Sequence, residues 1–495
     1  NRASGNPLNA PTATWTITFA TPISGLTAAN FAAINGGLGG AIVVSPPTEA
    51  VGPPSASWNV TVSTGTGSGT LGLNLVNDDG MSHSIGNLPF VGQTFTIDRI
   101  APTVVITMND TALKIGDSSL VTFSFSEAVT GFDNSDLTIP NGNLTAVSSS
   151  NGDVTFTGTY TPNANVEAPV NVIALNMSGV ADLAGNTGVG TSNSPNFGID
   201  TLRPTVGIVV ADDNLLAGET SLVTFSFSEA VTGFTNADLS IENGNLTPVS
   251  SSNGGLTFTA TLTPTASIID PSNLITVDNT GVADSAGNAG SGSTSSNNYA
   301  INTVRPTVGI VVADSVLVAG ETSMVTFTFS EAVSGFDNAD LTIGNGTLSQ
   351  VITSDGGVTF TATLTPTAGI NAPTNVITVN NTGYTNAAGN AGSGSSDSNN
   401  YAIDTVSRSL SINDVSVTEL DAGSNNLSFT VTVTPAAADG GVSFSIATQD
   451  GTALAASDYG AKSLTGQTIA AGASTATFTV SVNGDNLVEL DESVL

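Results

Sequence analysis

The sequence predicts an all-β protein built as a linear array of similar β-sandwich domains. The tetrapeptide Ser-Glu-Ala-Val begins at Ser126, Ser228 and Ser330, so the motif recurs every 102 residues. A repeat of this length is a whole domain and not one turn of a solenoid. Runs inside each repeat alternate apolar and polar residues with a period of two. No segment sustains the 3.6-residue period of an amphipathic helix.

The strands follow from that alternation. Residues 121–125 read Val-Thr-Phe-Ser-Phe, and a second run covers 154–160. The equivalent runs are 223–227 with 256–262 and 325–329 with 358–364. Asn-Gly pairs at Asn141, Asn243 and Asn345 lie between runs, where hairpin turns are expected. About seven short strands in about 100 residues describe an Ig-like β-sandwich.

Five domains are expected: a divergent first copy at 1–98, three regular copies at 99–200, 201–302 and 303–404, and a different pattern at 405–495. In the first copy, residues 15–19 take the place of 121–125. Trp15 and Trp58 lie in alternating runs, which predicts core positions, although an exposed sugar-stacking platform is the alternative. The joints between copies are short and contain proline, which restrains the backbone, so they are expected to be semi-rigid.

Charge and composition exclude several classes of partner. The chain has 40 acidic residues against 7 basic ones and a net charge of −33. Binding to nucleic acid requires Lys and Arg at phosphates, and an anionic membrane would repel this chain. There is no cysteine, so no disulfide or thiolate metal site can form. No apolar run approaches the roughly 18 residues that span a bilayer. Cations and neutral surfaces remain as partners.

Three motifs of the regular copies resemble a known family. They are Asp-x-x-x-Pro-Thr-Val, then Phe-Ser-Phe-Ser-Glu-Ala-Val-Thr-Gly-Phe, then Val-Ala-Asp-x-Ala-Gly-Asn. Together they resemble the bacterial Ig-like repeats of large surface proteins and adhesins, over 99–404 and more weakly over 1–98. In the first copy, Thr21 stands in the place of Glu127 and Asn30 in the place of Asp136. The resemblance implies a non-enzymatic protein at the bacterial cell surface.

The last segment is similar to a Calx-beta domain, another β-sandwich. The matching residues are Val-Thr-Glu at 417–419, Asp-Gly-Thr-Ala at 450–453, Ser-Asp-Tyr at 457–459 and Glu-Leu-Asp-Glu at 489–492. The sequence stops at Leu495, where the final strand of that family would begin. An incomplete domain is therefore expected at 405–495.

Oxygen-bearing side chains are expected to meet at one pole of each regular domain. Glu127 closes the second strand, Asp182 and Asn186 lie in the loop before the last strand, and Asp98 lies where the first strand begins. These positions share one end of an Ig-like sandwich. Ca²⁺ takes six to eight oxygen ligands, so the sequence predicts calcium sites, with simple Asx turns as the alternative. The candidates are Asp98, Glu127, Asp182 and Asn186; Asp200, Glu229, Asp284 and Asn288; and Asn302, Glu331 and Asn390.

Two sites are expected to differ from the first pair. In the third regular copy Asn302 and Asn386 replace Asp200 and Asp284, and the loss of two charges predicts weaker binding. For the last domain, the Calx-beta resemblance implies a calcium site with acids clustered at one pole. The alternative there is a solvated acidic rim. The matching candidates are Glu419, Asp458, Asp485, Glu489 and Glu492.

The function predicted from these patterns is an extracellular, calcium-stiffened stalk or filament component, of the kind found in adhesins and biofilms. The only histidine, His83, lies in a loop and is not accompanied by a nucleophile elbow, which argues against an enzyme. One alternative is a module that binds a glycan or a host or matrix surface. Another is head-to-tail self-assembly by strand exchange, because both ends look incomplete; truncation explains the same feature. An accessory region of a secreted enzyme is a weaker option.

Overall fold

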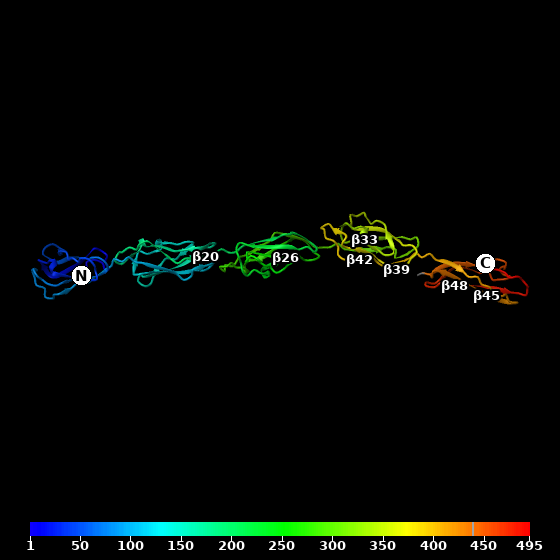
Figure 1. The fold of residues 1–495 in the computed structure, drawn as a ribbon, viewed down its shortest axis with the longest axis horizontal. Helices are drawn as coiled ribbons and strands as arrows, with labels where there is room; N and C mark the ends of the chain where they lie inside the picture. The colour runs from blue at the N-terminus through cyan, green and yellow to red at the C-terminus, as the bar shows by residue number, and fades with distance from the viewer. Residues whose placement is uncertain (438–439) are drawn as a thin grey trace.

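Five β-sandwiches follow one another along a single long axis (Figure 1). This computed structural model describes residues 1–437 and 440–495. Five separate hydrophobic clusters form the cores, one in each sandwich. Regular structure in the described residues consists of β-strands and short 3₁₀ helices. The predicted all-β class and the tandem arrangement of sandwiches are confirmed.

The first domain has two sheets, ordered β1-β4-β3 and β2-β5-β6, with β7 also paired to β5. Trp15 is 1% exposed and Trp58 is 7% exposed, so both belong to the core and neither forms a sugar-stacking platform. The Trp15 indole N–H donates to the Gln93 carbonyl at 2.6 Å. The elements are β1 (Thr12–Ile23), η1 (Ala28–Asn30), β2 (Phe31–Gly36), β3 (Thr48–Glu49), β4 (Ser55–Ser63), β5 (Gly69–Leu75), β6 (Phe90–Val91) and β7 (Phe95–Ile97).

The second domain pairs its two predicted runs as neighbouring antiparallel strands, β10 and β15, with Phe123 opposite Phe156. Its elements are β8 (Val104–Met108), β9 (Ala112–Leu113), β10 (Ser119–Phe125), β11 (Val129–Thr130), η2 (Asn134–Asp136), β12 (Leu137–Thr138), β13 (Gly142–Leu144), β14 (Ser148–Ser149), β15 (Thr155–Pro162), β16 (Glu167–Asn171), β17 (Ala174–Asn176), η3 (Met177–Gly179), β18 (Ala181–Asp182), β19 (Thr191–Asn193) and β20 (Phe197–Asp200).

The third domain repeats this pattern, with Phe225 opposite Phe258 in β23 and β26. Phe234 packs against both Phe225 and Phe258 at centroid distances of 5.1 Å. The elements are β21 (Val206–Val210), β22 (Asn214–Leu216), β23 (Ser221–Phe227), η4 (Asn236–Asp238), β24 (Leu239–Ile241), β25 (Gly244–Leu246), β26 (Thr257–Pro264), β27 (Ile269–Asn273), β28 (Ile275–Asp278), η5 (Asn279–Gly281), β29 (Ser293–Ser295) and β30 (Tyr299–Asn302).

The fourth domain is a third copy, with Phe327 opposite Phe360. Its elements are β31 (Val308–Val312), β32 (Val316–Val318), β33 (Ser323–Phe329), β34 (Val333–Ser334), η6 (Asn338–Asp340), β35 (Leu341–Ile343), β36 (Gly346–Leu348), β37 (Ile352–Thr353), β38 (Thr359–Pro366), β39 (Asn371–Asn375), β40 (Ile377–Asn380), β41 (Thr385–Asn386), β42 (Ser395–Asp397) and β43 (Tyr401–Asp404).

The last domain has a different strand order. One sheet is β44-β45-β48 and the other is the hairpin β46-β47. Its elements are β44 (Ser409–Ile412), β45 (Gly423–Thr434), β46 (Val442–Ala447), β47 (Ser463–Ile469) and β48 (Thr475–Gly484).

The Asn-Gly turns at Asn141, Asn243 and Asn345 do not close hairpins, contrary to the prediction from sequence. The strand after the Asn243 turn, β25, pairs with β26, whereas the strand before it, β24, pairs with β28 in the other sheet. The turn therefore carries the chain between the two sheets. Asn243 takes the left-handed φ of 51° that such a turn requires. Its amide donates to Asn273 Oδ1 at 2.7 Å. This bond attaches the turn to the last residue of β27.

Candidate metal sites at the joints between domains

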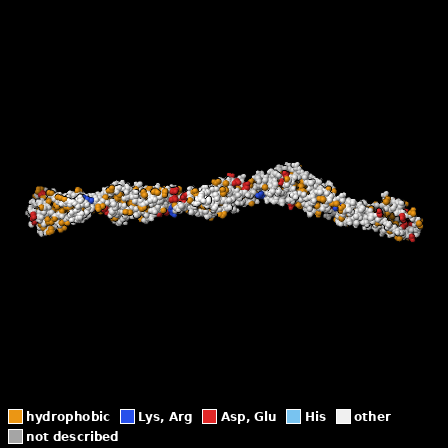
Figure 2. All heavy atoms as spheres, in the orientation of Figure 1, with side chains coloured by type: hydrophobic (Ala, Val, Ile, Leu, Met, Phe, Trp, Pro, Cys, Tyr) orange, Lys and Arg blue, Asp and Glu red, His pale blue; other side chains and the backbone are white. Residues whose placement is uncertain are grey.

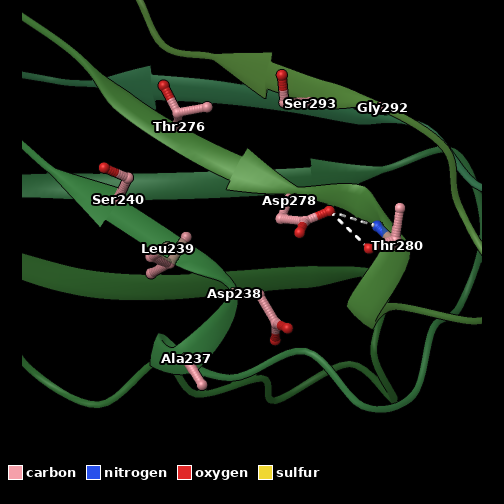
Figure 3. A pocket seen from close by; sticks show the side chains of 9 residues that line it. All are labelled: Ala237, Asp238, Leu239, Ser240, Thr276, Asp278, Thr280, Gly292 and Ser293. Carbon is pink, nitrogen blue, oxygen red and sulfur yellow. Dashed lines mark hydrogen bonds between the residues drawn. The ribbon is translucent and has the colours of Figure 1, made fainter.

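One shallow hollow lies on the third domain, but its chemistry does not suggest catalysis. The hollow of about 490 Å³ lies over β24, β28 and β29, and its lining includes four Ser or Thr residues together with Asp238 and Asp278 (Figure 3). Asp278 accepts from the Thr280 backbone N–H at 3.0 Å and from its hydroxyl at 2.7 Å. These bonds hold the pKa of Asp278 below its usual value. A stabilised carboxylate of this kind is a poor general base.

The more distinctive sites are the four joints, named here after the residue that ends the preceding domain: Asp98, Asp200, Asn302 and Asp404. On the visible face of the molecule, acidic atoms gather where the second sandwich meets the third (Figure 2). At the last three joints, a threonine that follows the named residue donates its hydroxyl back to the preceding domain. At the Asp200 joint, Thr201 donates to the Asn163 carbonyl at 2.7 Å. The linker is therefore attached to the domain it leaves.

The Asp200 joint brings three carboxylates together. One oxygen each of Asp200, Glu229 and Asp284 lie within 4.8 Å of one another. Asp284 is 3% exposed, and Glu229 lies two residues beyond the end of β23. Burial raises the pKa of Glu229, and the charges of Asp284, Asp200 and Glu167 raise it further. Glu229 Oε1 is buried and has no hydrogen-bond partner among the described residues. The cluster is rich in negative charge and short of donors.

The Asp98 joint repeats this arrangement. Oxygens of Asp98, Glu127 and Asp182 again lie within 4.8 Å of one another, and Asp182 is 2% exposed. Burial raises the pKa of Glu127, and the charges of Asp98 and Asp182 add to the effect. The sandwich topology thus places the three acids at one pole, where the sequence pattern expected them.

The loop asparagines are oriented differently from what the sequence suggested. Asn288 donates its amide N–H to the Asp200 carbonyl at 2.9 Å and to Asp284 Oδ2 at 2.8 Å. Its Oδ1 accepts from the backbone N–H of Ile115, in the preceding domain, at 2.8 Å. Because both backbone partners have fixed roles, the orientation of the amide is determined. The amide oxygen points to the neighbouring domain, away from the carboxylates.

The other copies share this orientation. Asn390 donates to the Asn302 carbonyl at 2.9 Å and accepts from the Ala217 N–H at 2.7 Å. Asn186 donates to the Asp98 carbonyl at 2.9 Å and faces the Asn9 amide at 3.3 Å. Asn186, Asn288 and Asn390 are therefore removed from the predicted ligand sets, because their oxygens are used in domain contacts. We call these three residues the joint asparagines. Sequence reasoning missed this role, although each of these asparagines ends an Ala-Gly-Asn triplet that marks the loop.

The Asn302 joint has a single acid, Glu331, among its three candidates. The amide of Asn386 donates to Glu331 Oε1 at 3.1 Å and to the Val304 carbonyl of the linker at 3.1 Å. Arg305 adds bonds to both domains, to the Ala391 carbonyl at 2.8 Å and the Ala217 carbonyl at 3.0 Å. Donors supplied by the chain therefore meet the acceptors at this joint.

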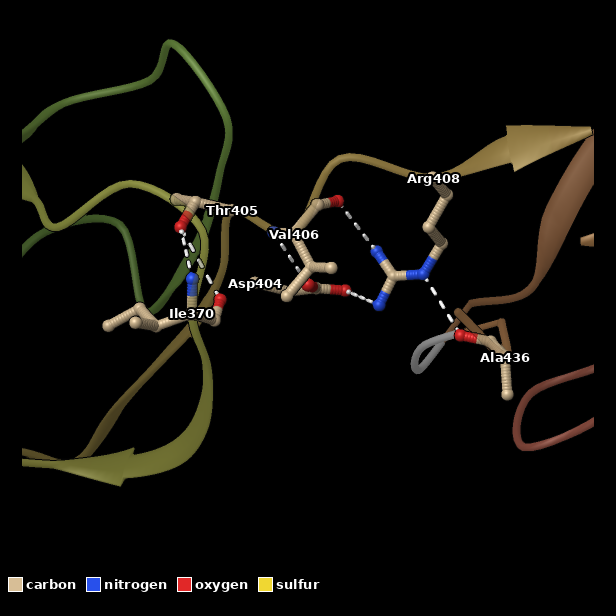
Figure 4. A network of polar contacts seen from close by, with 6 residues as sticks. All are labelled: Ile370, Asp404, Thr405, Val406, Arg408 and Ala436. Carbon is tan, nitrogen blue, oxygen red and sulfur yellow. Dashed lines mark hydrogen bonds and ion pairs between the residues drawn. The ribbon is translucent and has the colours of Figure 1, made fainter. Parts of the chain in front are cut away.

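The Asp404 joint is closed by an arginine (Figure 4). Arg408 Nη2 lies 2.8 Å from Asp404 Oδ2. The same guanidinium donates to the Val406 carbonyl at 3.2 Å and, from Nε, to the Ala436 carbonyl in the last domain at 3.0 Å. Among the residues that the structure describes, this is the one ion pair between side chains.

The last domain brings together three of its five candidates. Oxygens of Asp458, Glu489 and Glu492 lie within 4.8 Å of one another. Glu419 and Asp485 lie outside that group but contact each other, because the Asp485 N–H donates to Glu419 Oε1 at 3.3 Å. Desolvation and the charges of Asp458, Asp485 and Glu419 raise the pKa of Glu489. The group is more exposed than the clusters at the joints.

The fold and the joints define a class of protein: a tandem array of Ig-like sandwiches whose poles carry acidic or amide clusters. Residues 98–199, 200–301 and 302–403 each match the family described as bacterial Ig-like domain, and the chain belongs to that family. No curated protein matches the chain. Among the described residues, no helix has the length and apolar character needed to cross a membrane.

Several solved multidomain structures are similar to parts of the chain. The Escherichia coli adhesin FdeC is 13% identical, with a TM-score of 0.25, over 62% of this chain and 100% of its own. The I9–I11 tandem of titin is 10% identical, with a TM-score of 0.25, over 62% and 99%. The Yersinia pseudotuberculosis adhesin InvE is 15% identical, with a TM-score of 0.18, over 41% and 59%. We draw no argument about function from similarities of this size.

Proposed function

We propose that this chain is a segment of an extracellular bacterial stalk or adhesin in which Ca²⁺ holds neighbouring sandwiches in line. The ions would bind at the Asp98 and Asp200 joints, to Asp98, Glu127 and Asp182 and to Asp200, Glu229 and Asp284. The observation that carries the proposal is the recurrence of three converging carboxylates at the same pole of two consecutive domains. Among the described residues, no side-chain ion pair neutralises either cluster.

The chemistry of the clusters favours calcium over other ions. Each cluster supplies carboxylate oxygens only, without imidazole or thiolate, and such donor sets suit hard cations. Ca²⁺ tolerates irregular geometry and completes its six to eight ligands with backbone carbonyls and water. Extracellular calcium modules bind with a Kd of about 10⁻⁴–10⁻³ M, so such sites are filled outside the cell and emptied by chelators.

The shape supports a spacer role. The five sandwiches extend end to end without folding back on one another (Figure 1). The net charge of −33 opposes collapse of one domain onto the next. An ion at a joint would link the linker acid, Asp98 or Asp200, to two acids of the following sandwich. It would thereby restrict the hinge between domains.

The last domain fits the same proposal as a Calx-beta-like unit. Its candidate ligands are Asp458, Glu489 and Glu492, with Glu419 and Asp485 beside them. The greater exposure of these acids predicts weaker binding than at the Asp200 joint, because solvent screens exposed charges. Adhesion to a glycan by the first domain is less favoured, because Trp15 and Trp58 are buried in its core. Strand exchange between copies stays a prediction.

Small-angle X-ray scattering of the whole chain in CaCl₂ and in EDTA tests the proposal. We expect a longer maximum dimension in calcium, since the joints straighten, and a shorter, broader distribution in EDTA. The variant Asp200→Asn with Asp284→Asn should lose much of the response. Asp213→Asn is the matched control, because Asp213 is an exposed acid outside the cluster. Identical scattering profiles in calcium and EDTA would exclude calcium stiffening.

A further inference from the structure

We infer that the joints close by different chemistries, and that the amide of Asn386 locks the Asn302 joint where the two preceding joints take an ion. Among the four joints, only the two in the N-terminal half would then respond to divalent ions. The ion-dependent half of this inference rests on the proposed function. The lock by Asn386 stands on its own contacts.

Asp284 and Asn386 occupy the same place in successive copies. They are 3% and 4% exposed. Each accepts through Oδ1 from the backbone N–H of the joint asparagine of its loop, Asp284 from Asn288 at 2.8 Å and Asn386 from Asn390 at 2.9 Å. The loop fold is therefore indifferent to the exchange of a carboxylate for an amide. This makes the two copies matched variants of each other within one chain.

The difference lies in the second atom of each side chain. Asn386 places an NH₂ group there, and it bridges Glu331 of its own domain and the Val304 carbonyl of the linker. Asp284 places a second acceptor oxygen there, which accepts from the Asn288 amide at 2.8 Å, and its carboxylate belongs to the group with Glu229 and Asp200. Asn386 thus donates to the glutamate of the Asn302 joint, whereas the amide at the Asp200 joint, that of Asn288, donates to the aspartates and not to Glu229. Glu229 is left with a buried, unpartnered oxygen among the described residues.

At the Asp404 joint the donor to the acid is a guanidinium. Arg408 pairs with Asp404 and also donates to the Ala436 carbonyl of the last domain, so one side chain both neutralises the acid and crosses the joint. Arg305 likewise bonds both domains at the Asn302 joint. At the C-terminal two joints a side-chain donor therefore reaches the acid, Glu331 or Asp404. Arg99 and Arg203, at the first two joints, donate to backbone carbonyls and a hydroxyl and not to the acids. On loss of calcium, bending should be confined to the joints at Asp98 and Asp200.

Distances between spin labels across single joints test this inference. The chain has no cysteine, so label sites can be introduced without background. Leu120, Leu222 and Met324 occupy equivalent exposed positions on β10, β23 and β33, with 41%, 53% and 57% exposure. The Leu120→Cys and Leu222→Cys pair reports the Asp200 joint. The Leu222→Cys and Met324→Cys pair reports the Asn302 joint. We expect EDTA to broaden the first distance distribution and to leave the second narrow.

Reciprocal substitutions at positions 284 and 386 test the lock by Asn386 separately from calcium binding. Asn386→Asp should broaden the second distribution in EDTA, and calcium should narrow it again. Asp284→Asn should keep the first narrow in both solutions. The neighbouring copy shows that each exchange is compatible with the loop. Glu331→Ala removes the acceptor of the lock, and it should broaden the second distribution with or without calcium.

Each outcome decides one claim. Broadening of the second pair by EDTA in the wild-type background, or a narrow second pair in both Asn386→Asp and Glu331→Ala, overturns the lock. If neither pair responds to EDTA while Asn386→Asp broadens the second, the calcium proposal fails and the lock by Asn386 stands. If the first pair responds and both variants of the second joint stay narrow, calcium binding stands and the lock fails.

Discussion

Replacing Asp284 with asparagine should raise the stability of the third domain in EDTA and abolish its stabilisation by calcium. The reason is the crowding of the Asp200 joint. One oxygen each of Asp200, Glu229 and Asp284 lie within 4.8 Å. Replacing a buried acid normally lowers the stability of the folded domain, since the hydrogen-bond partners of the acid are left unpaired. Here an asparagine oxygen can keep the bonds from the backbone N–H groups of Gly287 and Asn288, and the remaining neighbours include two acids, so the expected sign is reversed.

The magnitude follows from those contacts. Two unit charges about 4.8 Å apart repel by about 1 kcal/mol in bulk water and about 3.5 kcal/mol at an effective dielectric constant of 20. Part of that relief is offset, because the bond from the Asn288 amide to Asp284 Oδ2 is lost, at about 1 kcal/mol. A net gain of up to about 2.5 kcal/mol remains, and each kcal/mol raises the Tm of a domain of this size by about 4–8 °C.

The calcium effect is of similar size in the wild type. At 10 to 100 times the Kd, one bound ion stabilises the folded domain by about 1.4–2.7 kcal/mol. Scanning calorimetry of the whole chain in EDTA and in calcium measures both effects, and the transition that moves in Asp284→Asn identifies the third domain. The control Asp213→Asn should keep the calcium shift. A variant that is less stable than wild type in EDTA, or that keeps the full calcium shift, would refute the reasoning.

Two further predictions concern the same joint. In EDTA, lowering the pH from neutral should stabilise the third domain. The folded-state pKa of Glu229 is raised above 4.5, chiefly by burial. Its contribution is therefore fully present below 4.5 and lost as pH rises through the raised value; thermal scans should show this trend weakened in Asp284→Asn. Asn288→Ala removes the bond to Ile115 of the preceding domain. It should broaden the label distances across the Asp200 joint in calcium and in EDTA alike, and an unchanged width would contradict the role of the joint asparagine.

The strands and the meeting of the acids could be predicted from the sequence, because both depend on repeated local patterns. Alternation with a period of two placed β10 and β15, and their apolar residues, such as Phe123 and Phe156, are in the core. The positions of Asp98, Glu127 and Asp182 in an Ig-like sandwich fixed their common pole. These inferences required only the topology of one domain.

The parts that the sequence did not reveal depend on contacts between domains. The orientation of the Asn288 amide is decided by the Ile115 N–H and the Asp200 carbonyl, and a pattern within one repeat cannot locate either. The Asn-Gly turn at Asn243 resembles a hairpin turn locally, yet its flanking strands belong to different sheets. Arg408 lies between the repeats and the last domain, where no repeat supplies an equivalent position to compare.

The joints present one physical problem with three answers. At each joint the linker and the loop bring backbone carbonyls and an acid close together. These oxygens are all hydrogen-bond acceptors, so they need a donor or a cation between them. The Asn302 joint supplies an amide donor from Asn386, and the Asp404 joint supplies the guanidinium of Arg408. At the Asp98 and Asp200 joints the described amides and guanidiniums bond to backbone carbonyls, a hydroxyl and the aspartates, and none of them donates to Glu127 or Glu229. Since the sandwiches are otherwise copies, this difference is the strongest reason to expect an ion at these two joints and at neither of the others.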